Sequence, residues 1–220
     1  MSPRAIAAAA RQAGLDAIAI TDHNTARNAS AFAIACQREG LLAFYGIEVC
    51  TIEEIHCLAL FETPEAAAHF GDYLYPLLPD FPNRPEKLGD QPVLDDDENI
   101  LELIPRYLGN ATSVPYSRLP SLVAGHGGLF IPAHIDRPAS GVLGRLGHLP
   151  PESGSILEIT PHHIDDMQRR FGGDHALLTF SDAHDLPAIG SFHTLIDMEE
   201  FTLSALRDAI ALRRLTLQKS

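Results

Sequence analysis

Four short apolar segments of this chain each lead into a histidine or a carboxylate. The segments and the polar residues that follow them are 17–20 with Asp22 and His23, 41–45 with Glu48, 129–133 with His134, and 176–180 with Asp182 and His184. In a parallel α/β protein the C-terminal ends of the strands lie on one face, and the active site forms there. Imidazole and carboxylate groups gathered on such a face make a metal site. The pattern therefore points to a metal-dependent hydrolase.

Glu48, His56 and His134 together combine two histidines with one carboxylate. Glu48 follows shortly after a glycine, and a hairpin-like return of the chain could bring His56, eight residues on, alongside it. Neutral imidazole with carboxylate suits zinc, manganese or iron, and a set without cysteine is more typical of a catalytic than of a structural site. Asp182 and His184 are separated by one residue, so both side chains can point toward one site where their strand ends.

Alternating strands and helices are predicted to position these residues. The sequence predicts strands over 16–20, 41–45, 54–61, 128–133, 155–160 and 176–181, and helices over 3–13, 26–38, 63–77, 117–125 and 202–213. Short apolar strands that alternate with helices are typical of βαβ units and a parallel sheet. Residues 78–113 break this rhythm with repeated prolines and an acidic run. We expect them to form an irregular insertion within a single domain of residues 1–220.

Composition narrows the class of protein. A length of 220 residues suits one domain, and a hydrophobic content of 45% allows a substantial core. The net charge of −13 disfavours a general nucleic-acid surface, although bound divalent ions would make a local site positive. No apolar stretch approaches the ~20 residues of a membrane span, and no secretory signal is visible. Three cysteines without a C-x-x-C pair suit a reducing cytoplasm, where we expect the protein to reside.

Five motifs, in order along the chain, resemble those of the PHP (polymerase and histidinol phosphatase) superfamily. They are Thr21-Asp22-His23, Gly46-Ile47-Glu48, His56, Pro132-Ala133-His134 and Ser181-Asp182-Ala183-His184. The resemblance implies an α/β fold, an irregular (β/α)7 barrel that holds two or three divalent metal ions and hydrolyses phosphoesters. It also implies that Glu48 bridges two metals and that His56 and His134 complete the coordination shell of one of them. Asp182 would bind a second metal, and His23 and His184 would hold a third.

One departure from the family concerns the first strand. PHP proteins begin with a strand that carries His-x-His, whereas this chain opens at Met1-Ser2-Pro3, which resembles the segment just after that motif. Either the chain is a truncated form or it has lost part of its site, and the intact remaining motifs favour truncation. A barrel without one strand leaves unpaired strand edges. We therefore expect lowered stability, or a loop or partner chain, such as a second copy in a homo-oligomer, that covers the gap.

Three further residues are candidates for catalysis. His184 or His163 could protonate a departing alkoxide, although the loop that holds His163 could equally be an ordinary polar loop. Arg137 could clamp a substrate phosphate, or it could form a surface ion pair. Glu158 could hold a ligand histidine in place from behind, or it could be an ordinary polar residue of the barrel interior.

The function we expect is hydrolysis of a phosphate ester by metal-activated water. A phosphomonoester, a nucleotide or a short oligonucleotide is compatible with the residues, and the partner we expect is a small phosphorylated substrate. A competing hypothesis is a non-catalytic or truncated PHP-like domain that binds metal or a partner as a scaffold. A third possibility, C–N hydrolysis of the amidohydrolase type, is disfavoured because no lysine lies near these strand ends.

Overall fold

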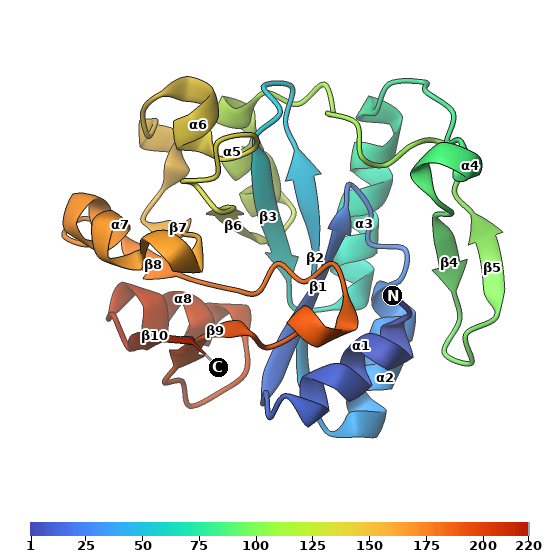
Figure 1. Ribbon diagram of the computed structural model, residues 1–220, viewed down its shortest axis with the longest axis horizontal. Helices are drawn as coiled ribbons and strands as arrows, with labels where there is room; N and C mark the ends of the chain where they lie inside the picture. The colour runs from blue at the N-terminus through green and yellow to red at the C-terminus, as the bar shows by residue number, and fades with distance from the viewer. Residues whose placement is uncertain (220) are drawn as a thin grey trace.

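The computed structural model describes residues 1–219, which form a mixed α/β fold around a four-stranded sheet (Figure 1). The order across this sheet is β1 (Ala17–His23), β2 (Leu42–Cys50), β3 (His56–Phe61) and β6 (Leu129–Pro132). β1 and β2 are parallel, whereas β3 runs antiparallel to both of its neighbours. The expectation of a wholly parallel sheet is therefore wrong at β3. The connection over residues 51–55 is too short for a crossover, and the hairpin return predicted for His56 is confirmed.

Two smaller sheets follow the central one. β7 (Ile156–Glu158) and β8 (Ala176–Leu178) form a parallel pair, and β9 (Phe192–Ile196) and β10 (Leu215–Lys219) form an antiparallel hairpin. Among the described residues these sheets do not join the central one into a closed barrel, and β1 has a strand neighbour only on its β2 side. The α/β class is confirmed, whereas the expected (β/α)7 barrel is seen only as separate sheets.

Helices surround the sheets, mostly where the sequence predicts them. The α-helices outside residues 78–113 are α1 (Pro3–Gln12), α2 (Ala29–Glu39), α3 (Pro64–Leu74), α5 (Leu119–Gly125), α6 (Val142–Leu146), α7 (Ile164–Phe171) and α8 (Leu203–Ala211). Single 3₁₀ turns are η1 (Tyr75–Leu77), η2 (Tyr116–Arg118), η3 (Pro151–Ser153), η4 (Pro161–His163) and η5 (Leu186–Ala188). Hydroxyls of Ser2, Thr63 and Thr202 cap α1, α3 and α8. No helix in residues 1–219 combines the length and apolar character needed to cross a membrane.

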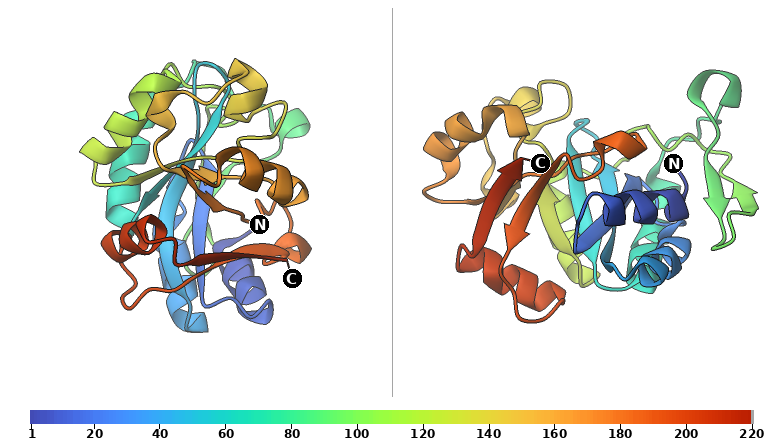
Figure 2. Two further views of the ribbon diagram at one scale, coloured as in Figure 1. Left: turned by 90° about the vertical axis from the view of Figure 1, so that its left-hand side faces the viewer. Right: turned by 60° about the horizontal axis from the view of Figure 1, so that its bottom comes forward.

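The segment over residues 78–113 holds more regular structure than expected. It contains the short helix α4 (Pro85–Leu88) and the hairpin of β4 (Pro92–Leu94) and β5 (Ile100–Leu103), which stands apart from the central sheet (Figure 2). Asn28, just before α2, fastens this hairpin, because its side chain bonds the backbone of Pro92 and Leu94 at 3.2 and 2.9 Å. The turn of the hairpin is held by an ion pair between Arg38 and Asp96.

Side chains of the central strands alternate between two cores. On one face Ile47 and Val49 of β2 pack with Phe61 of β3 and with helix α3. On the other face Phe44 of β2 packs with Leu58 of β3 and residues of β6, β8 and α8. Glu48 lies between Ile47 and Val49, so it projects to the second face. This placement puts its carboxylate on the face that packs against β8 and α8, where it lines a cavity with other predicted ligands.

Candidate metal centre

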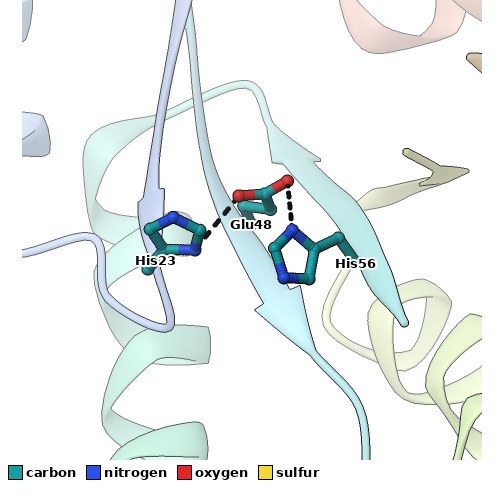
Figure 3. A group of neighbouring side chains, drawn as sticks. All are labelled: His23, Glu48 and His56. Carbon is teal, nitrogen blue, oxygen red and sulfur yellow. Dashed lines mark hydrogen bonds and ion pairs between the residues drawn. The ribbon is translucent and has the colours of Figure 1, made fainter. Parts of the chain in front are cut away.

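Glu48 is the centre of the site and is buried. His23 Nδ1 lies 3.1 Å from Oε2 of Glu48, and His56 Nδ1 lies 3.0 Å from Oε1 (Figure 3). His134 Nε2 reaches the same Oε1 at 3.2 Å. The structure therefore brings three of the six predicted metal ligands, all histidines, onto the carboxylate of a fourth, Glu48.

Strand register explains the convergence. His23 is the last residue of β1 and lies directly opposite Glu48 in the parallel pairing. His56 is the first residue of β3 and lies opposite Cys50, two positions after Glu48 on the same face of β2. His134 follows β6 and reaches the site across β3. Three strand ends thus supply the three imidazoles around one carboxylate.

The histidines change the proton affinity of the carboxylate. Burial by itself would raise the pKa of Glu48, but the hydrogen bonds from His134 and His56 outweigh it and hold that pKa below its ordinary value. Burial likewise opposes a charge on His56, yet its contacts with Cys50 and Glu48 raise its pKa to about 10. Without a metal ion, Glu48 and His56 therefore form an ion pair.

Asp182 and His184 form the second group of predicted ligands, after β8. The Asp182 carboxylate binds Arg137, with Nη2 2.7 Å from Oδ2, and His184 Nδ1 donates to the backbone oxygen of Asp182 at 2.8 Å. His184 lies close to the first group, with its ring 6.2 Å from that of His23. Arg137 thus makes an ion pair within the site, where its guanidinium lies beside a predicted metal ligand.

A cavity of about 1110 Å³ opens beside these groups. Much of its wall is apolar and comes from β1, β9 and β10. The predicted ligands that line it are His23, Glu48, His134, Asp182 and His184. A substrate in this cavity would therefore meet both groups of ligands together.

The donor set fits a divalent metal ion. One ligand atom from each of His23, Glu48 and His56 lies within 4.8 Å of the others, and no cysteine belongs to this group. In addition, Nε2 of His134 faces the same carboxylate, 3.2 Å from Oε1 of Glu48. Imidazole nitrogen with carboxylate oxygen suits zinc, manganese or iron.

Backbone strain marks two of the ligand positions. His134 and Asp182 have φ angles of 28° and 45°, in the left-handed region that residues other than glycine seldom adopt. Such conformations concentrate at functional sites. Asn24 also has a positive φ, and its amide bonds Cys50 N, Leu108 O and Asn110 O at 2.8 to 3.1 Å. It fastens the end of β1 to β2, a role that no sequence pattern indicated.

Glu158 contacts the backbone of a predicted ligand, whereas His163 bonds a residue near one. Glu158 is buried in β7 and accepts the backbone N–H of His134 at 3.2 Å, which places it behind a ligand as one of the two sequence interpretations proposed. Its burial, with the nearby charges of Asp182 and Glu48, raises its pKa to about 8. His163 contacts none of the predicted ligands directly. Its Nδ1 binds Asp136 at 2.7 Å, a partner that the sequence analysis missed.

Comparison with protein families identifies a known domain in this chain. A family model of the PHP domain matches residues 1–119, which is more than half of the chain and includes the His23, Glu48 and His56 motifs. Among curated proteins, no sequence matches this chain significantly.

Solved structures show the same fold at low sequence identity. The lesion-specific endonuclease EndoQ of Pyrococcus furiosus aligns with a TM-score of 0.68 and 15% identity, over 99% of this chain and 53% of its own. A protein of Bifidobacterium adolescentis assigned as a metal-dependent phosphoesterase aligns with a TM-score of 0.55 and 19% identity, over 96% of this chain and 91% of its own. A two-domain protein of Bacteroides vulgatus contains a predicted PHP-like metal-dependent phosphoesterase. It aligns with a TM-score of 0.53 and 16% identity, over 94% of this chain and 56% of its own. The chain thus spans about half the length of the endonuclease.

Proposed function

The chain belongs to the PHP domain family, and on that premise we propose that it hydrolyses phosphate esters with water activated at a divalent metal centre. The observation that supports this most directly is the buried Glu48 carboxylate with His23, His56 and His134 around it at 3.0 to 3.2 Å. Up to three zinc, manganese or iron ions would occupy a complete site. The substrate would be a phosphomonoester, a nucleotide or a short oligonucleotide.

The residues of the site have separate proposed roles in binding metal and in binding the phosphate. On the family resemblance, Glu48, His56 and His134 would hold the first metal, and Asp182, His184 and His23 would border the rest of the site. Divalent ions at such a centre supply an activated water and positive charge opposite the phosphoryl oxygens. Arg137, held by Asp182, adds a guanidinium that can form two parallel bonds to a phosphate. The acidic net charge favours a small ester over a long duplex as substrate.

The open edge of β1 belongs to this proposal. Among the described residues β1 has a strand neighbour only on its β2 side, and the cavity of about 1110 Å³ is lined by this strand. A second copy of the chain in a homo-oligomer would cover the same edge. If the open site holds metal but turns nothing over, the chain serves as a metal-binding scaffold instead.

The test combines metal content with turnover. The purified chain is loaded with Mn²⁺ or Zn²⁺, bound metal is measured by plasma mass spectrometry, and phosphate release is measured from aryl phosphates, nucleotides and a short oligonucleotide. We expect at least one metal per chain and release that EDTA abolishes. Glu48→Gln keeps the size of the side chain but removes the charge, so it is expected to lose metal and at least about 100-fold of activity.

The matched control is Glu65→Gln, on the exposed face of α3, which should change neither quantity. Absence of turnover on every substrate by the metal-loaded wild type would reject the phosphoesterase. Full activity in Glu48→Gln would reject this centre as its site.

A further inference from the structure

Asp136, His163 and Thr160 form a polar cluster beside the metal centre. The Asp136 side chain is only 4% exposed, whereas the His163 side chain that it binds is 58% exposed. Asp136 Oδ1 accepts the backbone N–H of Thr160 at 2.8 Å, and Oδ2 accepts both the Thr160 hydroxyl and Nδ1–H of His163, the latter at 2.7 Å. A buried carboxylate thus holds the inner nitrogen of an exposed imidazole.

The cluster lies next to the predicted ligands along two strand ends. Asp136 comes two residues after His134. The intervening Ile135 donates its backbone N–H to the backbone oxygen of Glu158 at 2.9 Å. Arg137, directly after Asp136, binds the predicted ligand Asp182 at 2.7 Å. One short turn after β6 therefore supplies a ligand, an anchor for His163 and a guanidinium. His163 is joined to this turn through its bond to Asp136.

The hydrogen bonds fix which nitrogen of His163 is free. The Asp136 carboxylate accepts three hydrogen bonds, two from Thr160 and one from His163. The carboxylate accepts and cannot donate, so the proton of the neutral ring stays on Nδ1. Nε2 then faces outward, without a hydrogen-bond partner among the described residues. Holding an exposed side chain in one rotamer costs conformational entropy, which this bond must offset.

We propose that His163 is the general acid for the departing alcohol and that Asp136 is its positioning residue. This proposal rests on the phosphoesterase function proposed above. As water adds to phosphorus and the bond from phosphorus to the ester oxygen breaks, the doubly protonated ring gives its Nε2 proton to that oxygen. Phosphate and a neutral alcohol leave, and the ring regains its proton from solvent. Asp136 keeps Nδ1–H throughout, as the carboxylate does in Asp–His pairs of hydrolases.

The first experiment is independent of activity and of metal. Long-range ¹H–¹⁵N spectra of the metal-free chain, recorded on the neutral ring, report which nitrogen of His163 carries the proton. We expect the Nδ1–H form in the wild type and a shift toward Nε2–H in Asp136→Asn, because the new amide can donate to Nδ1. A wild-type ring in the Nε2–H form, or one unaffected by Asp136→Asn, overturns the positioning role.

The second experiment separates proton donation from mere folding. Rates are compared on p-nitrophenyl phosphate, whose leaving group needs no acid, and on glycerol phosphate, whose alkoxide does. We expect His163→Gln to lose about 100-fold on glycerol phosphate but less than about threefold on the aryl ester, and Asp136→Asn to follow the same pattern more weakly. The matched control, His162→Ala, alters the exposed neighbouring ring and should change neither rate.

Equal losses on both esters, or no loss, would overturn the general-acid role while leaving the phosphoesterase function intact. If the wild type releases phosphate from no ester, the proposed function fails and the acid role fails with it. The spectra would still decide whether Asp136 orients the ring. Unfolding curves of each variant identify any loss that comes from a misfolded chain.

Discussion

At the level of single residues, Glu158 shows how one buried group can set the pH dependence of stability. Its carboxyl lies between the backbone of His134 and the charges of Asp182 and Glu48, and its burial is the main reason why its pKa rises to about 8. Its unfolded-state value is near 4.5. The folded chain therefore keeps a proton between these values that the unfolded chain has released, so this group's contribution to stability is complete below about pH 4.5 and is lost as the pH rises through 8.

Glu158→Gln tests this linkage in the metal-free chain. Gln cannot ionise, and its side-chain carbonyl can still accept the backbone N–H of His134. The variant should therefore not lose stability as the pH rises through 8. We expect similar stabilities at about pH 5 and a variant more stable by on the order of 3 kcal/mol at about pH 9. Urea unfolding across that range measures the difference, with the exposed Glu152→Gln as control. If the free energies of unfolding of wild type and variant changed in parallel with pH, folding would not raise the pKa of Glu158.

The candidate ligands were predictable residue by residue, whereas their supports were not. His23, Glu48, His56 and His134 each follow or lie in an apolar segment, and this pattern places them on strands. Asn24 and Asp136 are short polar residues in loops, and such residues usually form turns. Their roles depend on partners far along the chain, such as Leu108 for Asn24 and His163 for Asp136. Local pattern cannot indicate partners at that separation.

At the level of secondary-structure elements, β2 carries the site because its neighbours approach it closely at Gly46. A Cβ atom built there would lie 2.6 Å from the Ala59 backbone oxygen, 2.8 Å from Leu60 Cδ2 and 3.2 Å from Thr21 Cγ2. These contacts come from β3 and β1, the strands that hold His56 and His23. The glycine thus permits the spacing that lets both histidines reach Glu48.

Gly46→Ala is expected to separate these strands. Backbone on the β3 side cannot yield as a flexible side chain can, so the substitution should destabilise the fold by about 2–3 kcal/mol and weaken metal retention. Guanidinium unfolding and metal analysis measure the two effects. Gly125→Ala serves as control, because its added methyl meets nothing within 4 Å at the end of α5, and it should leave stability unchanged or slightly raised. Equal unfolding midpoints for the two variants would contradict this account of β2.

At the level of the whole molecule, the order of strands and helices was predictable but their assembly was not. The predicted strands and long helices appear with shifted ends, while α7 and the hairpins β4–β5 and β9–β10 were missed. Each hairpin strand has five residues or fewer, and such short segments carry a weak periodic signal. Closure of a barrel depends on contacts between distant strands. The separate sheets and the free edge of β1 could therefore be established only in the structure.

The free edge of β1 makes a last prediction about the assembled protein. Leu42 donates to Asp16 and Asn24 donates to Glu48, so the alternate N–H groups of Ile20 and Asp22 face β2. Those of Ala19 and Thr21 face the cavity side, and Ala19 is exposed. In hydrogen exchange followed by NMR, Ala19 and Thr21 should exchange at least about tenfold faster than Ile20 and Asp22. Slow exchange at Ala19 and Thr21 that strengthens with protein concentration would instead show a second copy paired to β1, and slow exchange independent of concentration would show that the edge is covered within one chain.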